Sequence, residues 1–112
     1  MQKEEFQNKF NSAKDLRDQA EVDAALNNFN DLYDQLIMAA GDYAKTIPGT
    51  VVDFNGQKRV TPLLFSEADK YLKRNDFVHQ VLIQLSELYT IKGDKKKSED
   101  FLAQAMKHKQ ED

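Results

Sequence analysis

Apolar residues recur along most of this chain at spacings of three and four positions, with charged residues between them. Side chains at these spacings share one face of an α-helix, so the pattern predicts a mostly helical protein. The first stripe runs through Phe6, Phe10 and Ala13, while Asp15 falls outside it. We therefore expect an amphipathic helix over about residues 2–19.

A second and longer stripe advances in steps of seven residues. It predicts a helix over about residues 21–45, ended by Pro48 and Gly49, because proline lacks an amide hydrogen and glycine leaves the helical conformation easily. The same spacing would also suit a seam between two copies of the chain, so a homodimer is a possible assembly. The stripe consists of Val22, Phe29, Leu36 and Tyr43.

A turn signal separates two β-favouring runs after this helix. Asn55-Gly56 supplies the two positive φ angles that a type I′ turn requires, so we expect a short β-hairpin over Thr50–Thr61. A two-stranded ribbon is marginal by itself. Its apolar side chains should therefore pack on the helices or meet a partner.

The rest of the chain returns to helical spacing. Pro62 opens one helix, Asp76 is a plausible N-cap for the next, and Gly93-Asp94 forms the turn before the last. Together with the first two, these segments predict an all-α, antiparallel five-helix bundle with a β-hairpin insertion, folded as one domain over residues 1–112. The three helices are expected over about residues 62–75, 77–91 and 95–109.

Composition is that of a globular protein, with 31% charged and 40% apolar residues. The chain has no cysteine, its first ten residues carry charges where a secretory signal needs an apolar run, and it holds no stretch of about 20 apolar residues. We expect a cytoplasmic protein without membrane association. Residues 1–53 carry a net charge of −5 and residues 54–112 one of +2, which leaves the N-terminal part acidic.

Residues 79–109 contain a more specific pattern. Leu82, Leu85, Ser86 and Tyr89 share one face, Gly93-Asp94 makes a turn, and Ser98, Leu102 and Ala105 line a second helix, on the face that is expected to meet the first. This order resembles the tetratricopeptide repeat (TPR), with its W-x-x-L-G-x-x-Y run followed by A, F and A. The resemblance implies a helical hairpin of a kind that grips other polypeptides. The expected β-hairpin interrupts the repeat period, so the resemblance implies a TPR-like bundle and not a regular superhelix.

The resemblance does not extend to the family's binding of C-terminal carboxylates, which uses lysine, asparagine and arginine on the first helix of a repeat. Those helix positions here hold Gln80, Ile83, Gln84 and Glu87.

Motifs for small-molecule chemistry are missing from the sequence. There is no glycine-rich phosphate loop, the two histidines are far apart, and the basic run Lys95–Lys97 lacks interleaved aromatic residues. We expect no cofactor, no metal site, no nucleic-acid partner and no enzymatic activity. His79 is the one candidate phosphoacceptor, but Leu82 and Ile83 stand where helical phosphotransfer domains carry lysine and glycine.

Two of the expected helices have more apolar surface than one core contact requires. Ile37 and Met38 lie beside the stripe of the second helix, and Ile83 and Ile91 lie off the stripe of the fourth. Such helices are either buried on two sides or form an interface. On the second interpretation, we expect a partner segment in a groove on the fourth helix with the hairpin at its rim. The candidate partner-binding residues are Ile83, Glu87, Thr90, Ile91, Val51 and Phe54.

These observations favour a non-enzymatic protein-interaction module, an adaptor or small chaperone-like subunit that holds a protein or peptide segment between helices. An immunity or antitoxin-type protein, which neutralises a partner through the acidic N-terminal face, is the main alternative. A histidine phosphotransfer protein centred on His79 is a further one.

Overall fold

The computed structural model describes the backbone of residues 3–109 and the side chains of residues 4–107. The prediction of a mostly helical chain with one β-hairpin is confirmed, and helix boundaries agree with the expected ones within about two residues. In chain order the elements are α1 (Lys3–Asp18), α2 (Val22–Lys45), β1 (Val51–Phe54), β2 (Gln57–Val60), α3 (Pro62–Arg74), α4 (Asp76–Lys92) and α5 (Lys95–Lys109).

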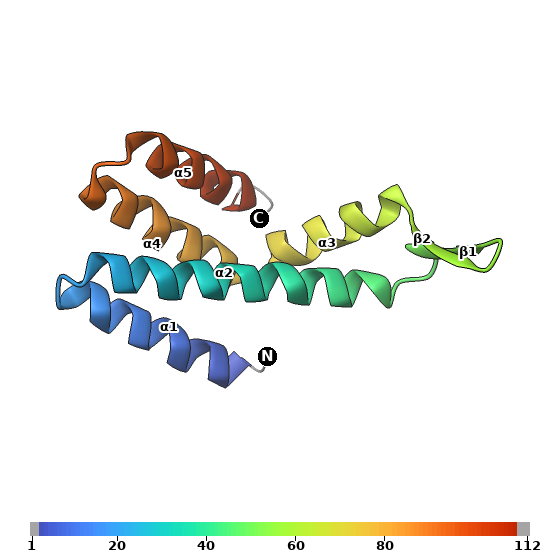
Figure 1. Cartoon of the computed structure of the whole chain (residues 1–112), viewed down its shortest axis with the longest axis horizontal. Coiled ribbons are helices and arrows are strands. Elements are labelled where there is room, and N and C mark those ends of the chain that lie inside the picture. Colours follow the sequence, from blue (N-terminus) through green and yellow to red (C-terminus); the bar gives the residue numbers. More distant parts are fainter. Residues whose placement is uncertain (1–2, 110–112) are drawn as a thin grey trace.

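Helix α2 is the central helix of the molecule (Figure 1). α1 and α4 pack along its first half, α5 packs on α4, and α3 packs on its second half. α3 and α4 therefore follow each other end to end along α2. We call α1, residues 22–36, α4 and α5 the bundle, and we call residues 37–74 the arm. The arm extends the molecule to 53 Å, against 28 Å in the other two directions.

The hydrophobic core lies in the bundle. Phe29 of α2 is fully buried and meets Phe10 of α1 edge-on, with ring centroids 5.5 Å apart. α4 supplies the other side of this core, whereas α3 contributes no buried residue to it within the described chain. The α4 core residues are Val78, Val81, Leu82, Leu85 and Leu88.

A single residue separates α3 from α4. Asn75 has an extended backbone, and its Oδ1 accepts a hydrogen bond from the amide of Phe77 at 2.9 Å. Asn75 is therefore the N-cap of α4, one position before the Asp76 that we expected. An asparagine side chain satisfies one of the amides that the first turn of a helix leaves unpaired.

Replacing Asn75 with alanine should lower the free energy of unfolding by about 1 kcal/mol, because this capping hydrogen bond is lost. Urea denaturation followed by circular dichroism measures the change. Asn27, exposed in the middle of α2, provides the matched control, since alanine there favours the helix. Equal losses for Asn75→Ala and Asn27→Ala would contradict the capping role.

The hairpin has the turn that its sequence predicts. Asn55 and Gly56 adopt φ angles of 52° and 78°, and Val51 of β1 pairs with Val60 of β2 in an antiparallel register. The buried Thr50 fixes the hairpin to the end of α2, because its Oγ1 donates to the carbonyl of Ala44 at 2.9 Å. The strands beyond this anchor are largely exposed.

α4 and α5 form a tightly packed antiparallel pair. Ser86 Oγ donates to the carbonyl of Ser98 at 2.8 Å where the two helices cross, and Tyr89 stacks on Phe101 at 5.5 Å. The expectation that Leu102 faces α4 is wrong, since Leu102 is 43% exposed. Phe101 takes that place, and the 100° rotation per residue turns Leu102 away.

Candidate functional site

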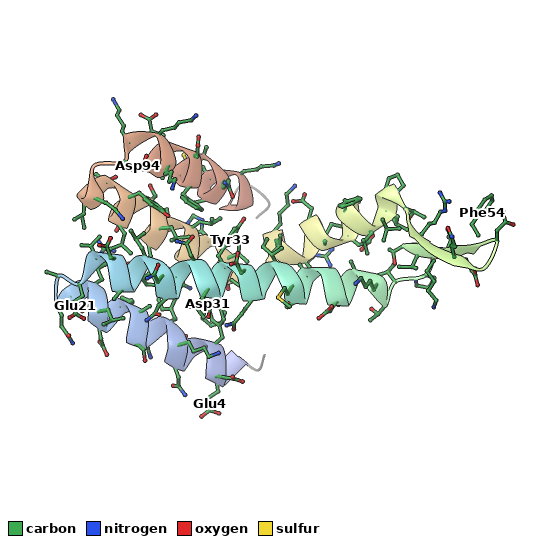
Figure 2. All side chains as sticks on the ribbon, viewed as in Figure 1. Glu4, Glu21, Asp31, Tyr33, Phe54 and Asp94 are labelled. Carbon is green, nitrogen blue, oxygen red and sulfur yellow. The ribbon has the colours of Figure 1, made fainter. Side chains whose placement is uncertain are left out.

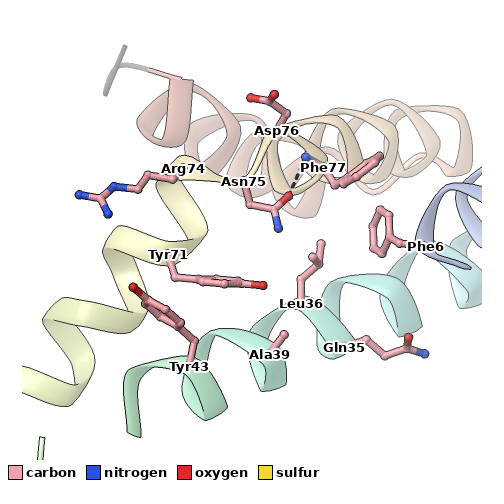
Figure 3. Close-up of a pocket in the computed structure, with 10 residues that line it drawn as sticks. All are labelled: Phe6, Gln35, Leu36, Ala39, Tyr43, Tyr71, Arg74, Asn75, Asp76 and Phe77. Atoms are coloured by element: carbon pink, nitrogen blue, oxygen red, sulfur yellow. Dashed lines mark hydrogen bonds between the residues drawn. The ribbon is translucent and has the colours of Figure 1, made fainter. Parts of the chain in front are cut away.

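An open pocket lies where the bundle meets the arm (Figure 3). We call it the trough. It has a volume of about 410 Å³ and is bordered by the first turns of α1, the middle of α2, the end of α3 and the start of α4. The residues that line it are Phe6, Gln35, Leu36, Ala39, Tyr43, Tyr71, Arg74, Asn75, Asp76 and Phe77.

Aromatic pairs form the two ends of the trough. Phe6 of α1 lies 4.5 Å from Phe77 of α4 between ring centroids, and Tyr43 of α2 lies 5.3 Å from Tyr71 of α3. Ala39 stands on α2 between these pairs, where its short side chain leaves the space open (Figure 3). The trough is thus walled by aromatic rings, the side chains that contribute most to binding energy in interfaces.

The edge of the trough is polar. Arg74 and Asp76 stand on either side of Asn75 at the α3–α4 junction and are exposed (Figure 3). On the α1 side, Gln35 donates from Nε2 to Asp31 at 2.8 Å, while its Oε1 is buried and accepts no hydrogen bond from any described group. An unpaired buried acceptor costs about 1–3 kcal/mol.

The four α4 residues expected to bind a partner are mostly engaged within the chain. Glu87 forms an ion pair with Arg17 of α1 at 3.0 Å, Thr90 donates to the carbonyl of Ser86 at 3.1 Å, and Ile83 packs partly buried against the core. Ile91 alone among them presents a largely free side chain, with 59% exposure.

The two hairpin residues lie elsewhere. Phe54 is 58% exposed at the far end of the arm, and Arg59 stacks over its ring at 5.6 Å (Figure 2). Val51 is half-buried at the base of the same hairpin. α4 runs from the arm toward the opposite end of the molecule (Figure 1), so the fold does not bring the six residues together into one groove.

His79 holds α4 against α5. Its Nδ1 lies 2.9 Å from the carbonyl oxygen of Ala105, which can only accept, so Nδ1 carries the hydrogen. A phosphotransfer role would therefore use the other ring nitrogen. Among residues 4–107, no three histidine, aspartate or glutamate side chains converge as metal ligands. No described helix has both the length and the apolar character needed to cross a membrane.

Sequence reasoning missed the trough as a site. It assigned Phe6 and Tyr43 to helix stripes, but a stripe does not reveal where the helix that covers it ends. The walls come from segments as far apart as Phe6 and Phe77, so no local pattern could join them. Compared with known proteins, the chain matches no protein-family model, no curated protein sequence and no solved structure.

Proposed function

We propose that this protein is a non-enzymatic interaction module, an adaptor or small chaperone-like subunit that holds a segment of a partner protein in the trough. The observation that carries the proposal is the aromatic-walled opening beside Ala39, bordered by exposed charges. A concave apolar site with a few polar groups at its edge is the usual form of a binding pocket.

The dimensions of the trough favour a particular kind of ligand. A volume of about 410 Å³ accommodates one large side chain together with the neighbouring backbone. The rings of Phe6, Tyr71 and Phe77 suit a leucine or an aromatic residue, and Arg74 and Asp76 suit charged residues on either side of it. An amphipathic helix supplies this combination, since its apolar residues share one face and its charged residues flank them.

The binding residues proposed here differ from those expected on α4. A partner that paired with Glu87 would have to replace its ion pair with Arg17, which is a change of contacts within the chain. The trough requires no such change. We retain the TPR-like description for the α4–α5 pair alone, on the small residues Ser86 and Ser98 at its crossing.

A photo-crosslinking amino acid at position 74, in cells of the native host, tests the proposal. Arg74 is exposed at the edge of the trough, so we expect one discrete crosslinked product. Ala39→Arg places a long side chain in the opening and should reduce the yield of that product at least about tenfold, equivalent to 1.4 kcal/mol of binding free energy.

Position 100 is the matched control, because Asp100 is also an exposed helical residue but lies on α5, away from the trough. A crosslinker there should yield no corresponding product. The proposal fails if both positions yield the same product, or if Ala39→Arg leaves the product at position 74 unchanged while circular dichroism shows that the variant is folded.

The acidic N-terminal face favours the second candidate function, neutralisation of a partner protein by an immunity or antitoxin-type mechanism. Residues 3–36 contain four Lys or Arg and eight Asp or Glu, a net charge of −4. Glu4 and Glu21 project from the bundle in Figure 2. Under this alternative, Asp15→Lys with Asp18→Lys would abolish partner binding, whereas trough binding would survive these changes.

A further inference from the structure

The outer face of α2, which points away from α3 and α4, changes character along its length. In the bundle this face carries the exposed polar residues Asn27 and Asp34. In the arm it carries Ile37, which is 40% exposed, and Met38, which is 68% exposed. Polar residues are ordinary on a helix surface that faces solvent, as in the first half of this face. Adjacent exposed apolar residues, as in the second half, are typical of an interface.

Gly41 lies one turn after these two residues on the same face. A Cβ atom at Gly41 would meet no described atom within 4 Å, so the chain by itself gives no steric reason for glycine. Glycine inside a helix is less stable than alanine. Close approach of another backbone would offset that cost, since a helix can cross directly over a glycine.

The chain exposes more surface than a compact monomer of its mass. The accessible surface is 7492 Å², whereas a folded monomer of 12.9 kDa exposes about 6300 Å². The radius of gyration is 16.1 Å, against about 13 Å for a compact domain of this length. The excess surface exceeds the roughly 800 Å² that each partner buries in a standard interface.

Two residues of opposite charge on this face, Asp34 and Lys45, are placed to pair between two copies of the chain. Asp34 precedes Gly41 by about 10 Å along the helix and Lys45 follows it by about 6 Å. No described residue forms an ion pair with either side chain. If a second α2 crosses antiparallel at Gly41, Asp34 of each copy comes within reach of Lys45 of the other, and the contact occurs twice.

We propose that the chain forms a symmetric dimer in which the α2 helices of two copies cross antiparallel at Gly41, with Ile37 and Met38 packed around the crossing. The trough uses the Gln35, Ala39 and Tyr43 side of α2, so the dimer leaves it open. The heptad positions first considered for a homodimer do not form this contact, since Phe29 and Leu36 are buried within the chain.

Sedimentation velocity of the full chain over a concentration series tests this proposal. The wild-type protein should dimerise. Asp34→Lys places two lysines opposite each other, at position 34 of one copy and position 45 of the other. Lys45→Glu places two carboxylates there. Each change should raise the dimer dissociation constant at least about tenfold, because like charges repel. The double variant restores opposite charges at both contacts and should return to the wild-type value. A heterologous partner would not produce that restoration.

Gly41→Leu provides an independent readout. It should be monomeric, because the added side chain blocks the crossing. Its midpoint of thermal unfolding should be no lower than that of the wild-type protein at concentrations where the wild type is monomeric, since a Cβ atom at position 41 meets no described atom within 4 Å. Asp15→Lys, on the exposed face of α1, is the charge control and should dimerise normally. A wild-type protein that stays monomeric throughout, or a double charge variant no better than either single one, would overturn the proposal.

Discussion

Replacing Phe29 with alanine is expected to lower the free energy of unfolding by about 3–5 kcal/mol. Phe29 is fully buried, meets Phe10 edge-on, and sits where α1 and α4 both pack on α2. Truncation leaves a cavity that three helices cannot all close. Because a domain of this size is stable by only about 5–15 kcal/mol, the loss should be visible as a large shift of the urea midpoint.

Phe65→Ala is the matched control, since it removes the same ring from α3. Phe65 is 67% exposed, so the expected change is within about 0.5 kcal/mol. The contrast between the two variants tests whether the core resides in the bundle alone. Comparable losses would show that the arm is buried in solution, against the arrangement described above.

Ser86→Leu is expected to destabilise the protein by about 1–3 kcal/mol and to loosen α5 from the bundle. Ser86 is 6% exposed at the crossing of α4 and α5, and its hydroxyl donates to the carbonyl of Ser98. A leucine there both removes this hydrogen bond and forces the helices apart. Hydrogen exchange of the α5 amides should therefore accelerate more than that of α1.

Two further serine variants separate these causes. Ser86→Ala removes the hydrogen bond without adding volume and should cost about 1 kcal/mol. Ser66→Leu, on the exposed part of α3, adds the same volume where nothing opposes it and should have little effect. If Ser86→Leu is as well tolerated as Ser66→Leu, close packing at this crossing is not required, and the proposal that α4 and α5 form a TPR-like pair loses its support.

The local structure was largely predictable because its determinants are close together in the sequence. Pro48 and Gly49 follow the end of α2, Asn55 and Gly56 supply the positive φ angles of the hairpin turn, and Gly93 ends α4 in a left-handed conformation. Each of these effects acts over a few residues. The N-cap of α4 differs from the prediction, since it is Asn75 and not Asp76. Both side chains are good caps, and the backbone conformation selects between them.

The candidate site was not predictable in the same way. Of the partner-binding residues expected on α4, Ile83 and Ile91 were chosen as apolar surplus, but Ile83 packs partly buried against the core. Phe54, expected at the rim of the same groove, lies at the far end of the arm. A surplus of apolar residues indicates that a helix has a second contact. It does not indicate whether another segment of the same chain makes that contact.

By itself, the sequence determined the number, type and ends of the elements, and which face of each helix is apolar. Only the tertiary structure decided that α3 and α4 lie end to end on α2, and this arrangement gave similar stripes different environments. Phe10 is 4% exposed because its helix lies against the core, whereas Phe65 is 67% exposed because no described helix covers its side of α3. The physical reason is that hydrophobic periodicity specifies a face to be buried, while burial depends on which distant segment packs there.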